Sequence, residues 1–174
     1  MPDDARARLD AQLAPYRRAY PDARWTHPRT WHLTLLFLGS VQPTRVARLE
    51  QLVEAVGIEV SPYAAVAERG GGRARLRGGV AWVALGAGAA ELIEAATIAV
   101  EHCPPDITEG PPPRRTPSAH LTVSRHVDES VIEALRSEAC GPLSVRWMVD
   151  RIQLVRSHLE PGGARYETLY ETTM

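Results

Sequence analysis

The sequence contains no lysine. All 20 of its basic residues are arginine, and asparagine is absent as well. Without a lysine amine the chain cannot form the lysyl-adenylate of an ATP-dependent nucleic-acid ligase, nor a Schiff base with a carbonyl substrate. It also lacks the phosphate-binding lysine of a P-loop. These enzyme classes are therefore excluded.

Long apolar runs are missing too. No stretch approaches the length that a membrane-spanning helix needs. The N-terminus carries Asp3, Asp4, Arg6 and Arg8 and lacks the apolar core of a signal peptide. The two cysteines, Cys103 and Cys140, have no C-x-x-C context, which is typical of reduced thiols. We therefore expect a cytoplasmic protein with no membrane partner.

The usual signatures of a metal centre are also absent. The sequence has neither C-x-x-C nor H-E-x-x-H, and its carboxylates do not lie near the candidate site at ligand spacing. We expect no metal and no other cofactor.

Neither sign of charge is in clear excess, with 20 basic and 21 acidic residues. The net charge of −1 creates no overall field that would attract RNA. Local clusters of arginine exist, however, and their planar guanidinium groups suit phosphate and can stack on bases. One cluster surrounds a glycine run and comprises Arg69, Arg73, Arg75 and Arg77, for which a solvated loop is an equal alternative. The pair Arg114 and Arg115 is the better candidate for an RNA contact.

The periodicity of apolar residues predicts a mixture of helices and strands. Helices are expected at 5–18, 43–56, 89–102 and 128–139. Strands are expected at 24–27, 31–38, 59–69, 80–85, 119–125, 144–147, 149–157 and 165–171. A turn is expected at 70–72 and a proline-rich connection at 103–117. Core positions are expected for the large side chains of Trp31, Phe37, Tyr63, Trp82 and Tyr166.

The tripeptide His-Leu-Thr occurs twice, starting at His32 and at His120. Each copy lies in an apolar run that predicts a strand, so His32 would share one face with Thr34, and His120 with Thr122. A short turn and an amphipathic helical pattern follow each copy. We interpret this as a weak internal duplication.

Paired imidazoles suit the cleavage of a phosphodiester without a metal. In-line displacement at phosphorus needs a base on one side and an acid on the other, and histidine can serve as either near neutral pH. The threonine hydroxyls could stabilise charge on the phosphoryl oxygens. The sequence alone does not say which histidine takes which role. The remaining four histidines, His27, His102, His126 and His158, are expected to be structural.

At these residues the chain resembles the 2H phosphoesterase superfamily, and more closely its RNA 2′,3′-cyclic phosphodiesterase branch, also called 2′-5′ RNA ligase-like. The first motif of that branch, H-x-T-L-x-F-L-G, fits residues 32–39 at every fixed position. The second, P-H-L-T-L-x-R, fits residues 119–125 with Ala119 for proline and Val123 for leucine. The likeness extends over roughly residues 24 to 171.

The resemblance implies roles for individual residues. His32 would donate a proton to the leaving oxygen, and His120 would activate water. The substrate phosphate would be bound by Thr34 and Thr122, with Arg125 nearby. Arg125 has the opposite strand parity to His120, so it reaches the phosphate only if the strand ends or twists there.

The resemblance also implies an α+β fold in which antiparallel sheets line a central cleft and helices pack outside. We expect a single domain over residues 1–174, with two pseudo-symmetric lobes that each carry one His-x-Thr motif, and a monomer. Relatives usually open with a strand, whereas this sequence begins with a helical pattern. Either its start is shortened or one sheet lacks an edge strand.

The expected function is hydrolysis of an RNA terminal 2′,3′-cyclic phosphate to a 2′-phosphomonoester, with RNA or a nucleotide bearing such an end as partner. Any 2′-5′ ligation would be this reaction run backwards without ATP. One alternative substrate is a small cyclic nucleotide or ADP-ribose cyclic phosphate. A second alternative is a non-catalytic module that binds RNA or a nucleotide.

Overall fold

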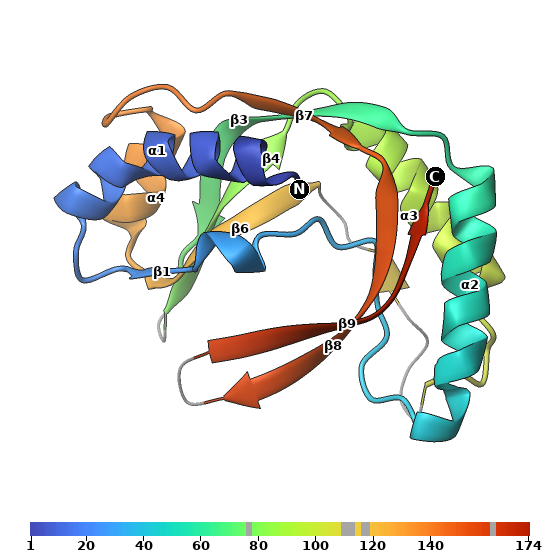
Figure 1. Cartoon of the computed structure of the whole chain (residues 1–174). Helices are drawn as coiled ribbons and strands as arrows, with labels where there is room; N and C mark the ends of the chain where they lie inside the picture. The colour runs from blue at the N-terminus through green and yellow to red at the C-terminus, as the bar shows by residue number, and fades with distance from the viewer. Residues whose placement is uncertain (76–77, 109–113, 116–118, 161–162) are drawn as a thin grey trace. The chain divides into compact units, whose positions relative to one another are not determined.

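The structure, a computed structural model, describes residues 1–75, 78–108, 114–115, 119–160 and 163–174 (Figure 1). The helices are α1 (Asp3–Ala19), α2 (Val46–Glu59), α3 (Ala89–His102) and α4 (Glu129–Arg136), with 3₁₀ turns η1 (Pro28–Thr30) and η2 (Pro43–Arg45). The strands are β1 (Arg24–Trp25), β2 (Leu36–Phe37), β3 (Tyr63–Arg73), β4 (Gly79–Leu85), β5 (Arg114–Arg115), β6 (His120–Val127), β7 (Val145–Val149), β8 (Arg151–Glu160) and β9 (Gly163–Thr173).

The chain divides into two compact units. The first comprises Met1–Leu33, Ala64–Ala89 and Ser118–Met148, and the second comprises Thr34–Tyr63, Ala90–Pro117 and Val149–Met174. The strand pairs of both units are antiparallel wherever their register is described. The predicted α+β class with antiparallel sheets is therefore confirmed.

A five-stranded sheet in the order β1-β6-β4-β3-β7 forms the centre of the first unit (Figure 1). One of its faces is buried by apolar side chains that alternate along β4 and β6, among them Ala81, Val83, Leu121 and Val123. Helix α4 lies against this buried face through Ile132 and Leu135. The opposite face carries half-buried and exposed side chains.

The glycine run does not form the expected turn, because Gly70, Gly71 and Gly72 continue strand β3. The reason is a close approach of α4. A Cβ at Gly70 would lie 2.0 Å from the carbonyl oxygen of Leu135, and one at Gly72 would lie 2.5 Å from Ile132. Glycine here serves helix–sheet packing and not chain reversal.

Helix α1 forms where the sequence predicts it. The apolar side chains of Leu9, Leu13 and Tyr16 follow a helical spacing and are fully buried. Acidic residues lie in the first turn and basic residues in the last, as the helix dipole favours. The Tyr16 hydroxyl donates to the carbonyl of Gly141 over 2.6 Å, which joins the end of α1 to the segment after α4.

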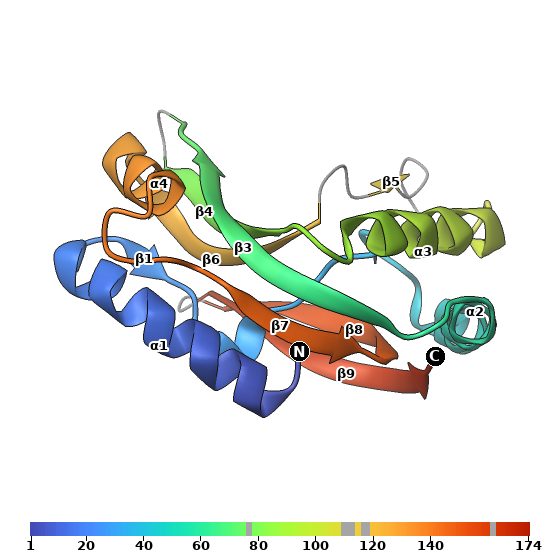
Figure 2. The same ribbon diagram turned by 90° about the horizontal axis from the view of Figure 1, so that it is seen from above.

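The second unit is built on the β8–β9 hairpin, against which α2 packs (Figure 2). The contact is close at Gly57, where a Cβ would lie 2.5 Å from the Thr172 methyl. Arg48 of α2 donates two hydrogen bonds, of 2.8 and 2.9 Å, to the Asp106 carboxylate in the segment after α3. The guanidinium holds the pKa of Asp106 down to about 2.

The expected strand at 31–38 is mostly wrong. Only Leu36 and Phe37 form a strand, and residues 31–35 run without a strand partner between η1 and β2. A strand needs a hydrogen-bonding neighbour, which an apolar pattern does not reveal. Phe37 was expected to be buried, but 72% of it is exposed.

Within the described part of the chain, no helix combines the length and apolar character needed to cross a bilayer.

Candidate active site

Strand β6 presents the second His-x-Thr motif in the predicted alternation. Leu121 and Val123 are fully buried, whereas His120 and Thr122 are half-buried on the opposite face. The imidazole and the hydroxyl therefore stand side by side on a strand that is hydrogen-bonded on both edges. Such a backbone can hold a site accurately.

A β-bulge corrects the expected position of Arg125. Ala81 pairs with Ser124 and Trp82 pairs with Thr122, so the register leaves Val123 as an extra residue. The extra residue reverses the alternation beyond it. Arg125 therefore lies opposite Val80, on the same face as His120 and Thr122. Strand parity therefore does not separate Arg125 from His120.

The register extends this arrangement across the sheet in three rows, which we call the motif face. The first row holds His120, Ala84 and Arg69, the second holds Thr122, Trp82 and Gly71, and the third holds Arg24, Arg125, Val80 and Arg73. Figure 1 shows the four strands β1, β6, β4 and β3 side by side. The buried side chains of β4 and β6 occupy the opposite face.

Trp82 is not the core residue that the sequence suggested. It is half-buried on the motif face, and its ring centroid lies 5.3 Å from that of His120 at an interplanar angle of 48°. A Cβ at Gly71 would lie 2.8 Å from the indole Nε1, so the ring lies close over the backbone of β3. Because every residue of β4 is apolar, its sequence does not show that Trp82 lies outside the core.

The segment that precedes the first motif is joined to the strand of the second motif by hydrogen bonds through Thr26. Trp31, which precedes His32, is 3% exposed, and its indole Nε1 donates to Thr26 Oγ1 over 2.9 Å. That hydroxyl donates in turn to the carbonyl of Thr122 over 3.0 Å, while the Thr26 amide donates to the carbonyl of Val123. The chain just before His32 is therefore fastened to the strand that carries His120. Sequence reasoning missed Thr26, since it belongs to neither motif.

His32 has a defined tautomer. Its Nδ1 lies 2.7 Å from the carbonyl oxygen of Thr30, and because a carbonyl can only accept, Nδ1 carries the proton. The ring is exposed, and Nε2 is the nitrogen that this hydrogen bond does not involve. Orientation of an imidazole by a backbone carbonyl is the usual arrangement for a histidine whose other nitrogen acts on a ligand.

The remaining predicted site residues belong to the second unit. Thr34 is half-buried and starts that unit, in the segment that is not a strand. Arg114 and Arg115 form β5, whose backbone pairs with β2 so that Leu36 lies opposite Arg115. The side chains of these two arginines lie outside the described part of the structure.

Three of the other histidines contact residues outside the two motifs. His27 Nδ1 accepts from the Arg29 amide over 3.2 Å and caps η1. His102 contacts Glu59, and His158 lies 2.8 Å from Glu167, whose pKa it lowers. His126 occupies a second bulge with φ of 55°.

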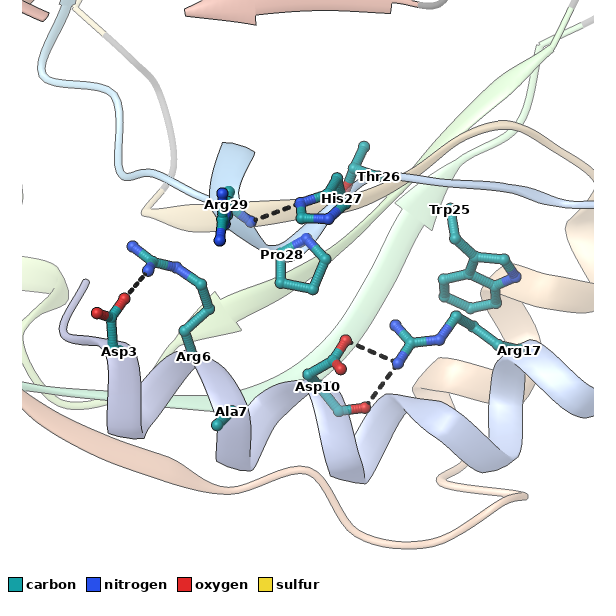
Figure 3. A pocket seen from close by; sticks show the side chains of 10 residues that line it. All are labelled: Asp3, Arg6, Ala7, Asp10, Arg17, Trp25, Thr26, His27, Pro28 and Arg29. Atoms are coloured by element: carbon teal, nitrogen blue, oxygen red, sulfur yellow. Dashed lines mark hydrogen bonds and ion pairs between the residues drawn. The ribbon is translucent and has the colours of Figure 1, made fainter.

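A pocket of about 530 Å³ lies between α1 and the segment Trp25–Arg29 of the first unit (Figure 3). Trp25, which lines it, alternates with Arg24 and so faces away from the motif face. The two carboxylates that line the pocket form ion pairs, Asp3 with Arg6 and Asp10 with Arg17. The pocket contains neither motif histidine and is a separate feature.

In the residues that the structure describes, no group of three or more His, Cys, Asp or Glu side chains could hold a metal ion.

Comparison with known proteins shows which families the chain is similar to. The family model for "LigT like Phosphoesterase" matches residues 1–82, a range that includes the first motif. An RNA 2′,3′-cyclic phosphodiesterase of Bacillus subtilis (strain 168) is 35% identical over 40 residues, which is 23% of this chain and 22% of that protein. The match thus spans only about a fifth of the curated relative.

The fold is shared over the full chain with solved structures. E. coli LigT in complex with 3′-AMP superposes with a TM-score of 0.74 at 21% identity, covering 100% of this chain and 93% of that one. TT0787 of Thermus thermophilus superposes with a TM-score of 0.72 at 22% identity, covering 99% and 93%. The first part of the chain thus matches the LigT-like phosphoesterase model, and the chain as a whole shares the fold of the LigT structures.

Proposed function

We propose that this protein is a metal-independent phosphodiesterase that opens RNA terminal 2′,3′-cyclic phosphate to a 2′-phosphomonoester, with His32 and His120 as the proton-transfer pair. The observation that carries the proposal is the pair of hydrogen bonds through Thr26, which fastens the chain before His32 to the strand of His120. The curated relative that bears a cyclic phosphodiesterase name supports the same reaction.

The proposed reaction follows from the two imidazoles. One ring accepts a proton from water as the water oxygen attacks phosphorus. The other donates a proton to the 3′ oxygen as the bond from phosphorus to that oxygen breaks, and the bond to the 2′ oxygen remains. Following the family resemblance, His120 is the base and His32 is the acid. His32 suits its role because Nδ1 is occupied by the Thr30 carbonyl, which commits Nε2 to proton transfer.

The phosphoryl oxygens need donors while charge builds on them. Thr122 stands beside His120 on the motif face, and the bulge brings Arg125 to that face as well. Thr34 follows His32 by two residues. We propose that these three side chains bind the phosphate, and that Arg114 and Arg115 contact the RNA. Any 2′-5′ ligation would be the same steps in reverse.

The proposal is tested with an oligoribonucleotide that ends in a 2′,3′-cyclic phosphate, incubated in EDTA. The wild-type protein should produce a 2′-phosphate end. His32→Ala and His120→Ala should each lower kcat by about 10²–10⁴, because each loses one proton-transfer group. His158→Ala is the matched control, since His158 pairs with Glu167 in β8–β9.

Full activity in either motif variant would reject the mechanism, and a 3′-phosphate product would reject the assignment of the leaving oxygen. Turnover of a cyclic mononucleotide alone would favour the small-molecule alternative. Binding without turnover of either would favour a non-catalytic module.

A further inference from the structure

The motif face carries more positive charge than one phosphate requires. Its third row holds Arg24, Arg125 and Arg73, and its first row adds Arg69. All four arginines are exposed. None of the ten positions of the motif face is acidic. Such a face is complementary to a ligand with several phosphates.

The third row is also distant from the histidine. Ala84 of β4 pairs with His120, and Val80 of β4 lies in the third row. These two residues are four positions apart, so the rows are separated by about 13 Å along the strand. Across the sheet, Arg24 and Arg73 are separated by three strand spacings, or about 14 Å. A cyclic mononucleotide has one phosphate, which the His-x-Thr motif would occupy. It would not reach Arg24 and Arg73 at the two ends of the arginine row.

Between these rows stands a partly exposed aromatic surface. Trp82 is half-buried in the middle row, beside Thr122 and against the backbone of Gly71. Its ring lies 5.3 Å from the His120 ring. An indole held next to a phosphate site offers a platform on which a nucleobase can stack, whatever its identity.

We infer that the motif face binds the single-stranded RNA immediately 5′ of the cyclic end, so that the substrate class is an oligoribonucleotide and not a mononucleotide. A base stacks on Trp82, and upstream phosphates contact Arg24 and Arg73 on either side of Arg125. This inference rests on the proposed function for the position of the cyclic end. It adds a strand-binding surface that the His-x-Thr motifs do not include.

The test measures binding, so that it does not depend on turnover. The probe is a fluorescent single-stranded oligoribonucleotide with a 2′-phosphate end, titrated at several salt concentrations. For Arg73→Gln we expect weaker binding and a slope of log K against log salt reduced in magnitude by about 0.7, the value for one phosphate contact on a single strand. Arg18→Gln makes the same charge change on exposed α1 and should match the wild type.

Two conservative variants separate the roles from a folding defect. Arg73→Lys keeps the charge and should restore the salt slope. Trp82→Phe keeps a stacking surface and should bind within a few-fold of the wild type, whereas Trp82→Ala should bind at least about fivefold more weakly. Equal effects of the phenylalanine and alanine variants would overturn the stacking role.

Equal salt slopes for Arg73→Gln and Arg18→Gln would overturn the strand-binding surface. If hydrolysis of the cyclic end persists in that case, the proposed function stands and only this inference fails. If Arg73→Gln weakens binding while no cyclic phosphate is ever hydrolysed, the surface stands and the proposed function fails.

Discussion

The single residue Thr26 has an influence beyond its own position. Its hydroxyl accepts from the buried indole of Trp31 and donates to the carbonyl of Thr122, so it links the residue before one histidine to the strand of the other. Neither sequence motif contains it. A hydroxyl suits this place because it can both accept and donate, whereas the indole can only donate and the carbonyl can only accept.

We therefore expect Thr26→Val to lower the free energy of unfolding by about 1–3 kcal/mol, since it leaves the Trp31 indole and the Thr122 carbonyl without their partner. It should also lower kcat, because the chain before His32 loses its fastening. Urea unfolding and steady-state kinetics provide the two readouts. Thr26→Ser keeps the hydroxyl and should retain both properties. A valine variant as stable and active as the serine variant would contradict this role.

Strands and helices were predictable where the pattern of burial is simple. The sequence predicts α1 and α3 well because the apolar residues of each helix repeat with a single helical period. It predicts the first half of β6 equally well, where buried and half-buried residues alternate from His120 to Val123. It does not predict the bulge at Val123, which depends on the register with β4. It misassigns residues 70–72 as a turn, because glycine permits a turn and a close helix contact equally well.

The same limit applies to the site. The two His-x-Thr motifs are visible in the sequence, but the strand expected around His32 is absent. Trp82 was expected in the core but lies on the motif face. The sequence could not show this, because a strand that is apolar on both faces gives no sign of which face is covered. Arg24 was overlooked because only the β1–β6 register places it beside Arg125.

The glycines of β3 provide a prediction at the level of the element. A Cβ at Gly70 would meet the backbone of α4 at 2.0 Å, whereas a Cβ at Gly71 would meet only the side chain of Trp82. Backbone cannot yield without moving the helix, but a side chain can rotate. We expect Gly70→Ala to lower the free energy of unfolding by about 1–3 kcal/mol or more, and Gly71→Ala to cost less.

Chemical denaturation measures both stabilities, and tryptophan fluorescence reports the change around Trp82 that only Gly71→Ala should produce. Equal stability losses in the two variants would show that α4 does not hold the position described for it.

For the molecule as a whole, acid tolerance depends in part on the second unit. The two hydrogen bonds from Arg48 lower the pKa of Asp106 to about 2 from its ordinary value of 3.8. A carboxyl whose pKa is lower in the folded state than in the unfolded state stabilises the folded state at pH values above the unfolded-state pKa. The stabilisation is lost as pH falls through the folded value.

The wild type should therefore exceed Asp106→Asn in stability above about pH 3.8, and this difference should shrink as the pH approaches about 2. Both side chains are roughly half exposed, so the difference will be small and weaker in high salt. Urea unfolding at a series of pH values is the measurement. A constant difference across that range would contradict the pairing.

The chain divides into two compact units, and the single domain over residues 1–174 stays a prediction. Both motif imidazoles belong to the first unit, and Thr34 begins the second. The proposed proton-transfer pair is thus carried by a single unit.

The central claim is that the imidazoles of His32 and His120 act on one phosphoryl group. It is tested most directly by NMR of protein labelled at its six histidines, titrated with a nucleoside 2′-monophosphate. The account predicts that the ring resonances of both residues shift with the same dissociation constant, while those of His158 do not. Shifts in only one of the two rings, or two unrelated dissociation constants, would contradict it.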